Sequence, residues 1–190
     1  EQDLRQAIAL QPRYADALQP LGDLLVDTKR YEEGIRVLER VLDVDPSRDS
    51  ARVQIVEAYA TWGRPAQALA ALEVLIRKSP RNLGMRLLKA RLVGEAGDPA
   101  AALALLKSLA NEYPDKPDPL WMWMSIVAKE KTFDPDDALD VLARLRRVAK
   151  DDDERRRVDT IVDGINRQKA AAAGAMQPCL LYTSPSPRDR

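Results

Sequence analysis

The chain has 190 residues, and its 30 Lys and Arg residues balance 30 Asp and Glu residues, so it carries no net charge at pH 7. This balance gives no long-range field that attracts nucleic acid or an anionic membrane. Histidine is absent and the single cysteine is Cys179, which predicts no zinc site and no disulfide, and we expect no cofactor. The longest apolar runs, such as 103–106, are too short to cross a bilayer. We therefore expect a soluble protein, cytoplasmic or periplasmic, without membrane insertion.

Four prolines recur at a constant interval of 34 residues. Each follows a stretch in which apolar residues recur every three or four positions, which is typical of a helix with one buried face that the proline then ends. The prolines are Pro12, Pro46, Pro80 and Pro114, and the apolar sets before them are Leu4, Ala7 and Ile8; Leu38, Val41 and Leu42; Leu72, Leu75 and Ile76; and Leu106, Leu109 and Ala110. The sequence therefore predicts a repeated unit whose last element is a helix.

Another helical pattern precedes that helix in each unit. In residues 15–48, Leu18, Leu21 and Leu25 fall on one helical face, and a turn is expected at 28–30. The second helix of this unit is predicted over 32–44. Each unit is thus expected to be a hairpin of two helices.

Glycine and proline mark the turns of the later units. Gly63 and Gly97 stand at the same position of successive units, as do Pro65 and Pro99. We expect each glycine to end the first helix in the left-handed conformation, and each proline to lie in the first turn of the second helix.

Period and patterned positions together resemble the tetratricopeptide repeat family. The resemblance rests on the run Leu18-x-x-Leu21-Gly22-x-x-Leu25, on Gly34-x-x-x-Leu38 and Pro46, and in later units on Ile55, Val56, Tyr59, Ala68, Leu72, Pro80, Ala90, Gly97, Ala102, Leu106 and Pro114. It implies an all-α fold, a right-handed superhelical solenoid of antiparallel helix hairpins with three to four repeats and a capping helix. In the third unit, Arg86 and Lys89 depart from the family pattern, because bulky apolar residues are usual there.

The predicted organisation follows the same frame. We expect the second helix of a truncated repeat at 1–14, repeats at 15–48, 49–82 and 83–116, a divergent repeat at 117–149, a capping helix at 151–169 and a disordered tail at 170–190. Residues 179–190 resemble a translated sequencing-library adapter and are expected to be an artefact; a phosphorylatable Ser-Pro tail is the alternative.

No catalytic constellation is expected. The carboxylates of Asp134, Asp136 and Asp137 cluster where a helix begins, and acidic side chains there cap free backbone N–H groups. The charged stretch 144–157 places cations at the end of one predicted helix and acids at the start of the next, which matches the helix dipoles rather than a nucleic-acid surface. These patterns indicate that the chain is not an enzyme.

The resemblance also implies a binding groove lined by the first helices of the repeats. The groove positions carried over from the family are Asp16, Gln19, Asp23, Asp27, Val53, Glu57, Leu87, Arg91, Trp121, Ser125 and Lys129. This groove is acidic at one end and has an aromatic residue at the other, so it suits a peptide with basic residues toward one end and an apolar residue toward the other. Chaperone-binding members of the family grip a terminal carboxylate with Lys, Arg and Asn, and here Gln19, Asp23 and Val53 stand instead.

Within the run 121–124, Trp123 and Met124 fall on core positions, whereas Trp121 falls on the groove and is a candidate anchor for a partner. The leading hypothesis is a scaffold for a peptide or protein partner. One alternative is the non-catalytic repeat region of a larger enzyme or of an envelope or secretion assembly. An RNA-binding helical repeat is the third, and the acidic groove residues argue against it.

Overall fold

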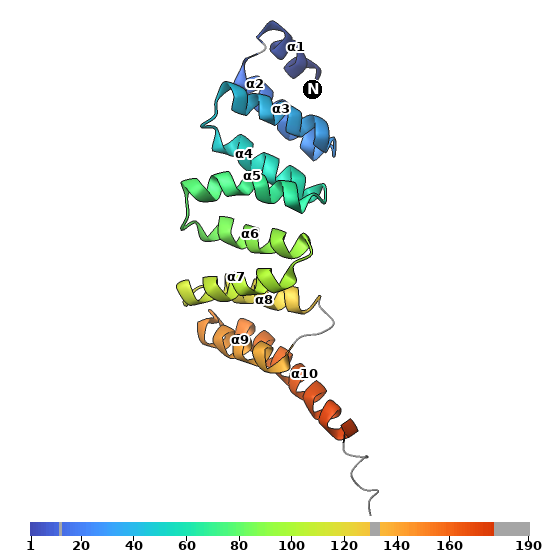
Figure 1. Ribbon diagram of the computed structural model, residues 1–190, viewed down its shortest axis with the longest axis vertical. Coiled ribbons are helices and arrows are strands. Elements are labelled where there is room, and N and C mark those ends of the chain that lie inside the picture. Colours follow the sequence, from blue (N-terminus) through green and yellow to red (C-terminus); the bar gives the residue numbers. More distant parts are fainter. Residues whose placement is uncertain (12, 130–133, 177–190) are drawn as a thin grey trace, which may run out of the picture. The chain divides into compact units, whose positions relative to one another are not determined.

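The computed structural model describes residues 1–11, 13–129 and 134–176, and within these ranges the chain forms helices and no strand. Figure 1 shows the helices, which are α1 (Gln2–Leu10), α2 (Ala15–Asp27), α3 (Tyr31–Val44), α4 (Asp49–Thr61), α5 (Pro65–Lys78), α6 (Leu83–Glu95), α7 (Pro99–Glu112), α8 (Asp118–Val127), α9 (Pro135–Val148) and α10 (Asp152–Met176). The expected all-α helical-repeat fold is confirmed. The adapter-like segment 179–190 lies outside the described residues.

The chain divides into two compact units, Glu1–Leu109 and Ala110–Arg190, and the division falls inside α7. In the first unit, α1 packs on α2, and each helix from α2 to α5 packs on the next along the chain. In the second unit, α8 packs on α9 and α9 on α10. Figure 1 shows α2 with α3 and α4 with α5 as hairpins joined by short turns.

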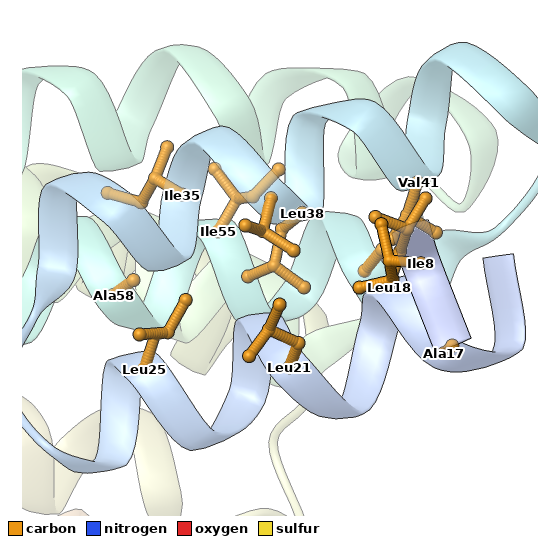
Figure 2. Close-up of a cluster of buried hydrophobic side chains, with 12 residues drawn as sticks. Ile8, Ala17, Leu18, Leu21, Leu25, Ile35, Leu38, Val41, Ile55 and Ala58 are labelled. Carbon is orange, nitrogen blue, oxygen red and sulfur yellow. The ribbon is translucent and has the colours of Figure 1, made fainter. Parts of the chain in front are cut away.

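The apolar residues that the periodicity singled out form the core. Leu38, Leu72 and Leu106 are at most 1% exposed. Figure 2 shows the side chains of Leu21 from α2, Leu38 from α3 and Ile55 from α4 pointing toward one another in one cluster. In the first unit, the α2–α3 hairpin therefore shares an apolar face with α4 of the following hairpin, as a repeat stack requires.

Two glycines let α2 and α3 approach closely. A Cβ atom on Gly22 would lie 2.6 Å from Cγ of Leu38, and one on Gly34 would lie 2.8 Å from Cγ2 of Val26. Both distances are far below van der Waals contact, so a larger side chain at either position would force the two helices apart.

The turns after the first helices use the left-handed conformation. Gly63 has φ +75° and Gly97 has φ +101°, as the sequence predicted. Lys29 stands 34 residues before Gly63 and adopts the same conformation at φ 63°. A side chain there strains the backbone, since only glycine adopts this conformation without cost.

Helix α6 departs from the family's apolar pattern and helix α10 is longer than the sequence predicted, and both differences have local explanations. Lys89, at a position that is apolar in the family pattern, extends its ammonium group 2.6 Å from the Glu73 carboxylate on α5. Helix α10 continues to Met176, beyond the end expected for the capping helix at 169. The reason is the alanine-rich stretch 170–175, because alanine has the highest intrinsic helix propensity.

Candidate functional site

The predicted groove residues of the first unit lie mainly on α2 and α4, and this surface is called the α2–α4 face below. It comprises Asp16, Gln19, Asp23, Asp27, Ser50, Val53 and Glu57. The two helices are joined here by side chains, since the Gln19 amide donates a hydrogen bond to Ser50 Oγ at 3.1 Å. The Arg48 guanidinium contacts the Asp16 carboxylate at 2.9 Å. One end of the face is thus held by polar contacts within the chain.

The other end of the α2–α4 face carries carboxylates without partners. Oδ1 of Asp23 is buried and has no hydrogen-bond partner among the described residues. Burial raises the pKa of the Asp23 carboxyl above its usual value, and the negative charges of Asp27 and Glu57 raise that pKa further. Asp27 and Glu57 are exposed, and neither forms an ion pair within the described ranges. This end of the face therefore lacks a cation.

The α6 portion of the predicted groove is less acidic. Leu87 is partly buried, and Arg91 is exposed and lies 3.6 Å from the Glu95 carboxylate one helical turn later. An exposed pair of this kind contributes little to stability, because solvent screens it. Arg91 is therefore available to other anions.

In the second unit, Trp121 is held by α10. Its indole N–H donates to Oε1 of Glu154 at 2.9 Å, and the Arg157 guanidinium lies 5.5 Å from the ring centroid. Ser125 donates to the carbonyl of Met122 in its own helix, and Lys129 is exposed just beyond the end of α8. Trp121 is half-buried, so part of the residue is exposed to solvent. Its indole N–H group already donates to Glu154 and is not free to bind a partner.

Glu154 connects this tryptophan to the start of α10. Its carboxylate also accepts the backbone N–H of Lys150 at 2.9 Å, while the Asp151 side chain accepts the N–H of Glu154 at 2.7 Å. The pKa of Glu154 is lowered, first by the Lys150 N–H and then by the Trp121 indole. The acids at the start of α10 therefore act as a helix cap, as the dipole interpretation predicted.

The carboxylates before α9 also serve as a cap, because Asp134 accepts the backbone N–H of Asp136 at 2.9 Å. Among the described residues, no cluster of three acidic or cysteine side chains could hold a metal ion. In the same part of the chain, no helix combines the length and apolar character needed to span a membrane.

Sequence reasoning missed several residues that shape these surfaces. Arg48, Glu154 and Arg157 fix predicted groove residues from outside the groove positions. Trp62 was also missed; it stacks against Tyr31 and Tyr59, with ring centroids 6.1 and 6.5 Å apart. For the contacts between different helices, the sequence signal is a separation close to one repeat, such as the 33 residues between Trp121 and Glu154.

Stacked hairpins with a repeated core define the chain as a helical-repeat protein. A sequence model of the tetratricopeptide repeat matches residues 1–60 and 62–122, which is more than half of the chain. The protein therefore belongs to the tetratricopeptide repeat (TPR) family. No curated protein sequence matches it significantly.

Solved structures show the same fold. One is YrrB, described as a TPR protein with an unusual peptide-binding site, with 16% identity and a TM-score of 0.58 over 91% of this chain and 87% of that one. MamA from Desulfovibrio magneticus RS-1 matches with 14% identity and a TM-score of 0.60 over 76% and 79% of the two chains. PilF from Pseudomonas aeruginosa matches with 21% identity and a TM-score of 0.52 over 84% and 72%. At these identities the likeness concerns the fold alone.

Proposed function

We propose that the chain is a non-catalytic scaffold that binds a peptide or a partner protein on the surfaces of its first helices. The unpaired carboxylates of the α2–α4 face carry this proposal. Asp23 keeps a buried oxygen without a donor, and Asp27 and Glu57 add negative charge beside it. A Lys or Arg side chain of a partner would supply both the donor and the positive charge.

The remainder of the face fits a peptide rather than a small ion. Val53 is partly buried beside Glu57 on the next helical turn, so it offers apolar contact next to the acidic end. The hydrogen bond between Gln19 and Ser50 holds α2 and α4 together before a partner binds. Binding therefore costs less conformational entropy, because these helices are already ordered. A nucleic acid is disfavoured because its phosphates would meet these carboxylates.

The second unit offers a different chemistry. The exposed part of the Trp121 ring and the ammonium group of Lys129 suit an apolar or an acidic residue of the partner. Because Glu154 already accepts the indole N–H, Trp121 contributes its ring surface rather than a hydrogen bond. The structural likeness to YrrB, whose description names a peptide-binding site, supports a peptide as the guest.

A displayed library of random dodecapeptides, panned against the full chain, tests this function. We expect enriched peptides to carry Lys or Arg. The double variant Asp23→Asn, Glu57→Gln should bind these peptides at least about tenfold more weakly than the unaltered chain does. Binding should also weaken as salt is raised, because exposed charges are screened.

Asp140→Asn is the matched control, since Asp140 is an exposed carboxylate on α9 that is not a predicted groove residue. Circular dichroism should show that all variants remain folded. The proposal fails when no peptide is enriched, or when every enriched peptide binds the double variant and the control equally well.

A further inference from the structure

A crevice runs between α3 and α5 in the first unit, on the side of α4 that faces away from the α2–α4 face. It encloses about 580 Å³ and is called the α3–α5 crevice below. Its apolar lining consists of Leu42 from α3, Ile55 and Tyr59 from α4, and Ala70 and Ala71 from α5. Ile55 and Tyr59 lie on the opposite side of α4 from Val53 and Glu57, because residues two apart point in opposite directions on a helix. The crevice is therefore separate from the proposed groove.

The residues at the equivalent positions of the neighbouring repeats differ from those that line the crevice. One repeat later, Leu105 stands where the crevice has Ala71, and Lys89 stands where it has Ile55. The Lys89 ammonium group pairs there with Glu73, which corresponds to Glu39. Ala71 is thus smaller than Leu105, the residue at the equivalent position of the next repeat.

One repeat earlier, an ion pair bridges the corresponding helices. Arg5 of α1 stands 34 residues before Glu39 and contacts the Glu33 carboxylate of α3 at 2.6 Å. At the α3–α5 crevice, Glu39 faces Gln67 of α5 instead, so this bridge is missing. The α3–α5 crevice therefore lies where the ion pair formed by Arg5 in the preceding repeat has no counterpart among the described residues.

The rim of the crevice is acidic and unpaired. Glu39 and Asp43 lie one helical turn apart on α3, both exposed, and neither has a hydrogen-bond or ion-pair partner within the described residues. Arg52, which also lines the crevice, has a buried Nε–H group without an acceptor. The Arg52 guanidinium does donate one long hydrogen bond, from Nη2 to the carbonyl oxygen of Pro46 at 3.5 Å. A buried donor without an acceptor is costly, so an occupant that supplies one is favoured.

We propose that the α3–α5 crevice binds a short segment of a partner protein in which an apolar side chain lies next to a Lys or Arg. The apolar side chain packs on Leu42, Ile55 and Ala71. The basic side chain pairs with Glu39 and Asp43, and the Arg52 side chain, whose buried Nε–H lacks an acceptor, turns to donate to a backbone carbonyl of the segment. Charge complementarity selects this occupant, because among the described residues the two carboxylates of Glu39 and Asp43 have no cation beside them and outnumber the single guanidinium of Arg52, which also lines the crevice without an ion pair.

Two substitutions that copy the next repeat test the crevice. Ala71→Leu introduces the residue found at position 105 and fills the space, and Asp43→Arg introduces the residue found at position 77 and reverses the charge of the rim. The dodecapeptide library described above is panned against the unaltered chain, and each enriched peptide is then measured against both variants by fluorescence anisotropy. We expect a class of peptides with an apolar residue adjacent to Lys or Arg that binds each variant about tenfold more weakly.

Binding of this class should not change in the double variant Asp23→Asn, Glu57→Gln, which separates the crevice from the α2–α4 face. Circular dichroism and urea unfolding verify that Ala71→Leu and Asp43→Arg are folded. The proposal is overturned when no enriched peptide loses affinity for Ala71→Leu, or when the peptides that do lose it lack a basic residue. Peptides sensitive only to the Asp23 and Glu57 changes would support the groove and reject the crevice.

Discussion

The indole N–H of Trp121 and the carboxylate of Glu154 form a 2.9 Å hydrogen bond between α8 and α10. The same carboxylate accepts the backbone N–H of Lys150, so Glu154 both caps α10 and holds the tryptophan. Its lowered pKa means that the folded chain prefers the ionised form. Ionised Glu154 therefore stabilises the second unit.

Glu154→Ala is expected to lower the free energy of unfolding by about 1 to 2 kcal/mol at neutral pH, because the cap and the indole acceptor are both lost. Since the folded pKa is lowered, this stabilisation is present above the ordinary value of 4.5 and is lost as pH falls through the folded pKa. Urea unfolding followed by circular dichroism across this pH range measures it. Asp153→Ala is the control, because the side chains of Asp153 and Arg156 are 88% and 75% exposed and their pair contributes little. Equal losses in the two variants would contradict the role of Glu154.

Asp23→Asn is expected to raise the free energy of unfolding at neutral pH. The pKa of Asp23 is raised in the folded chain, so its contribution to stability is largest below the ordinary value of 3.8 and is lost as pH rises through the folded pKa. The amide carries no charge and avoids this loss. Urea unfolding should therefore show an advantage for the variant at neutral pH that vanishes in acid. An advantage that persists unchanged in acid would mean that charge is not the cause.

Gly22→Ala is expected to lower the free energy of unfolding by about 1 to 3 kcal/mol, since the new Cβ would clash with Leu38 and separate α2 from α3. Gly164→Ala in α10 is the matched control, because a Cβ there meets nothing within 4 Å. That substitution should stabilise the helix by about 1 kcal/mol, in line with helix propensity. Thermal unfolding of both variants measures the contrast, and a loss at Gly164 equal to that at Gly22 would rule out the steric explanation.

Lys29→Gly is expected to stabilise the chain by about 1 kcal/mol or less, because glycine relieves the left-handed backbone while adding freedom to the unfolded chain. The reverse change, Gly63→Ala, should cost about 1 kcal/mol, since its Cβ meets no atom within 4 Å and the cost is conformational. Urea unfolding decides between these signs. Destabilisation by Lys29→Gly would show that the lysine side chain, rather than its backbone, matters at this turn.

Helices and core were predictable because both follow from local patterns. The expected second helix over 32–44 matches α3, which begins at Tyr31 and ends at Val44. Leu38 and Leu72 are buried for the reason that their spacing indicated, since one face of each helix must leave water. The left-handed turn at Gly63 was predictable because glycine alone adopts it without strain.

The partners of the surface side chains were not predictable from such patterns. Trp121 of α8 was predicted to be a candidate anchor for a partner. The structure adds contacts that the pattern did not indicate, because Glu154 and Arg157 of α10 both contact its indole ring. Lys89 was recognised as a departure from the apolar pattern, but its pairing with Glu73 depends on how α5 and α6 pack. Such contacts arise from the distance and rotation between helices, which hydrophobic periodicity does not determine.

Helix α1 buries a single residue, Ile8, and leaves Leu10 85% exposed. Leu4 and Ala7 are only partly buried against the core, and exposed ion pairs of Arg5 with Glu33 and of Glu1 with Arg30 add to the attachment of α1. Dissolved electrolyte weakens attraction between exposed charges far more than it weakens apolar burial. Added salt should therefore loosen α1 before it loosens the better buried helices, and the amide protons of α1 should exchange earlier than those of α3 to α5.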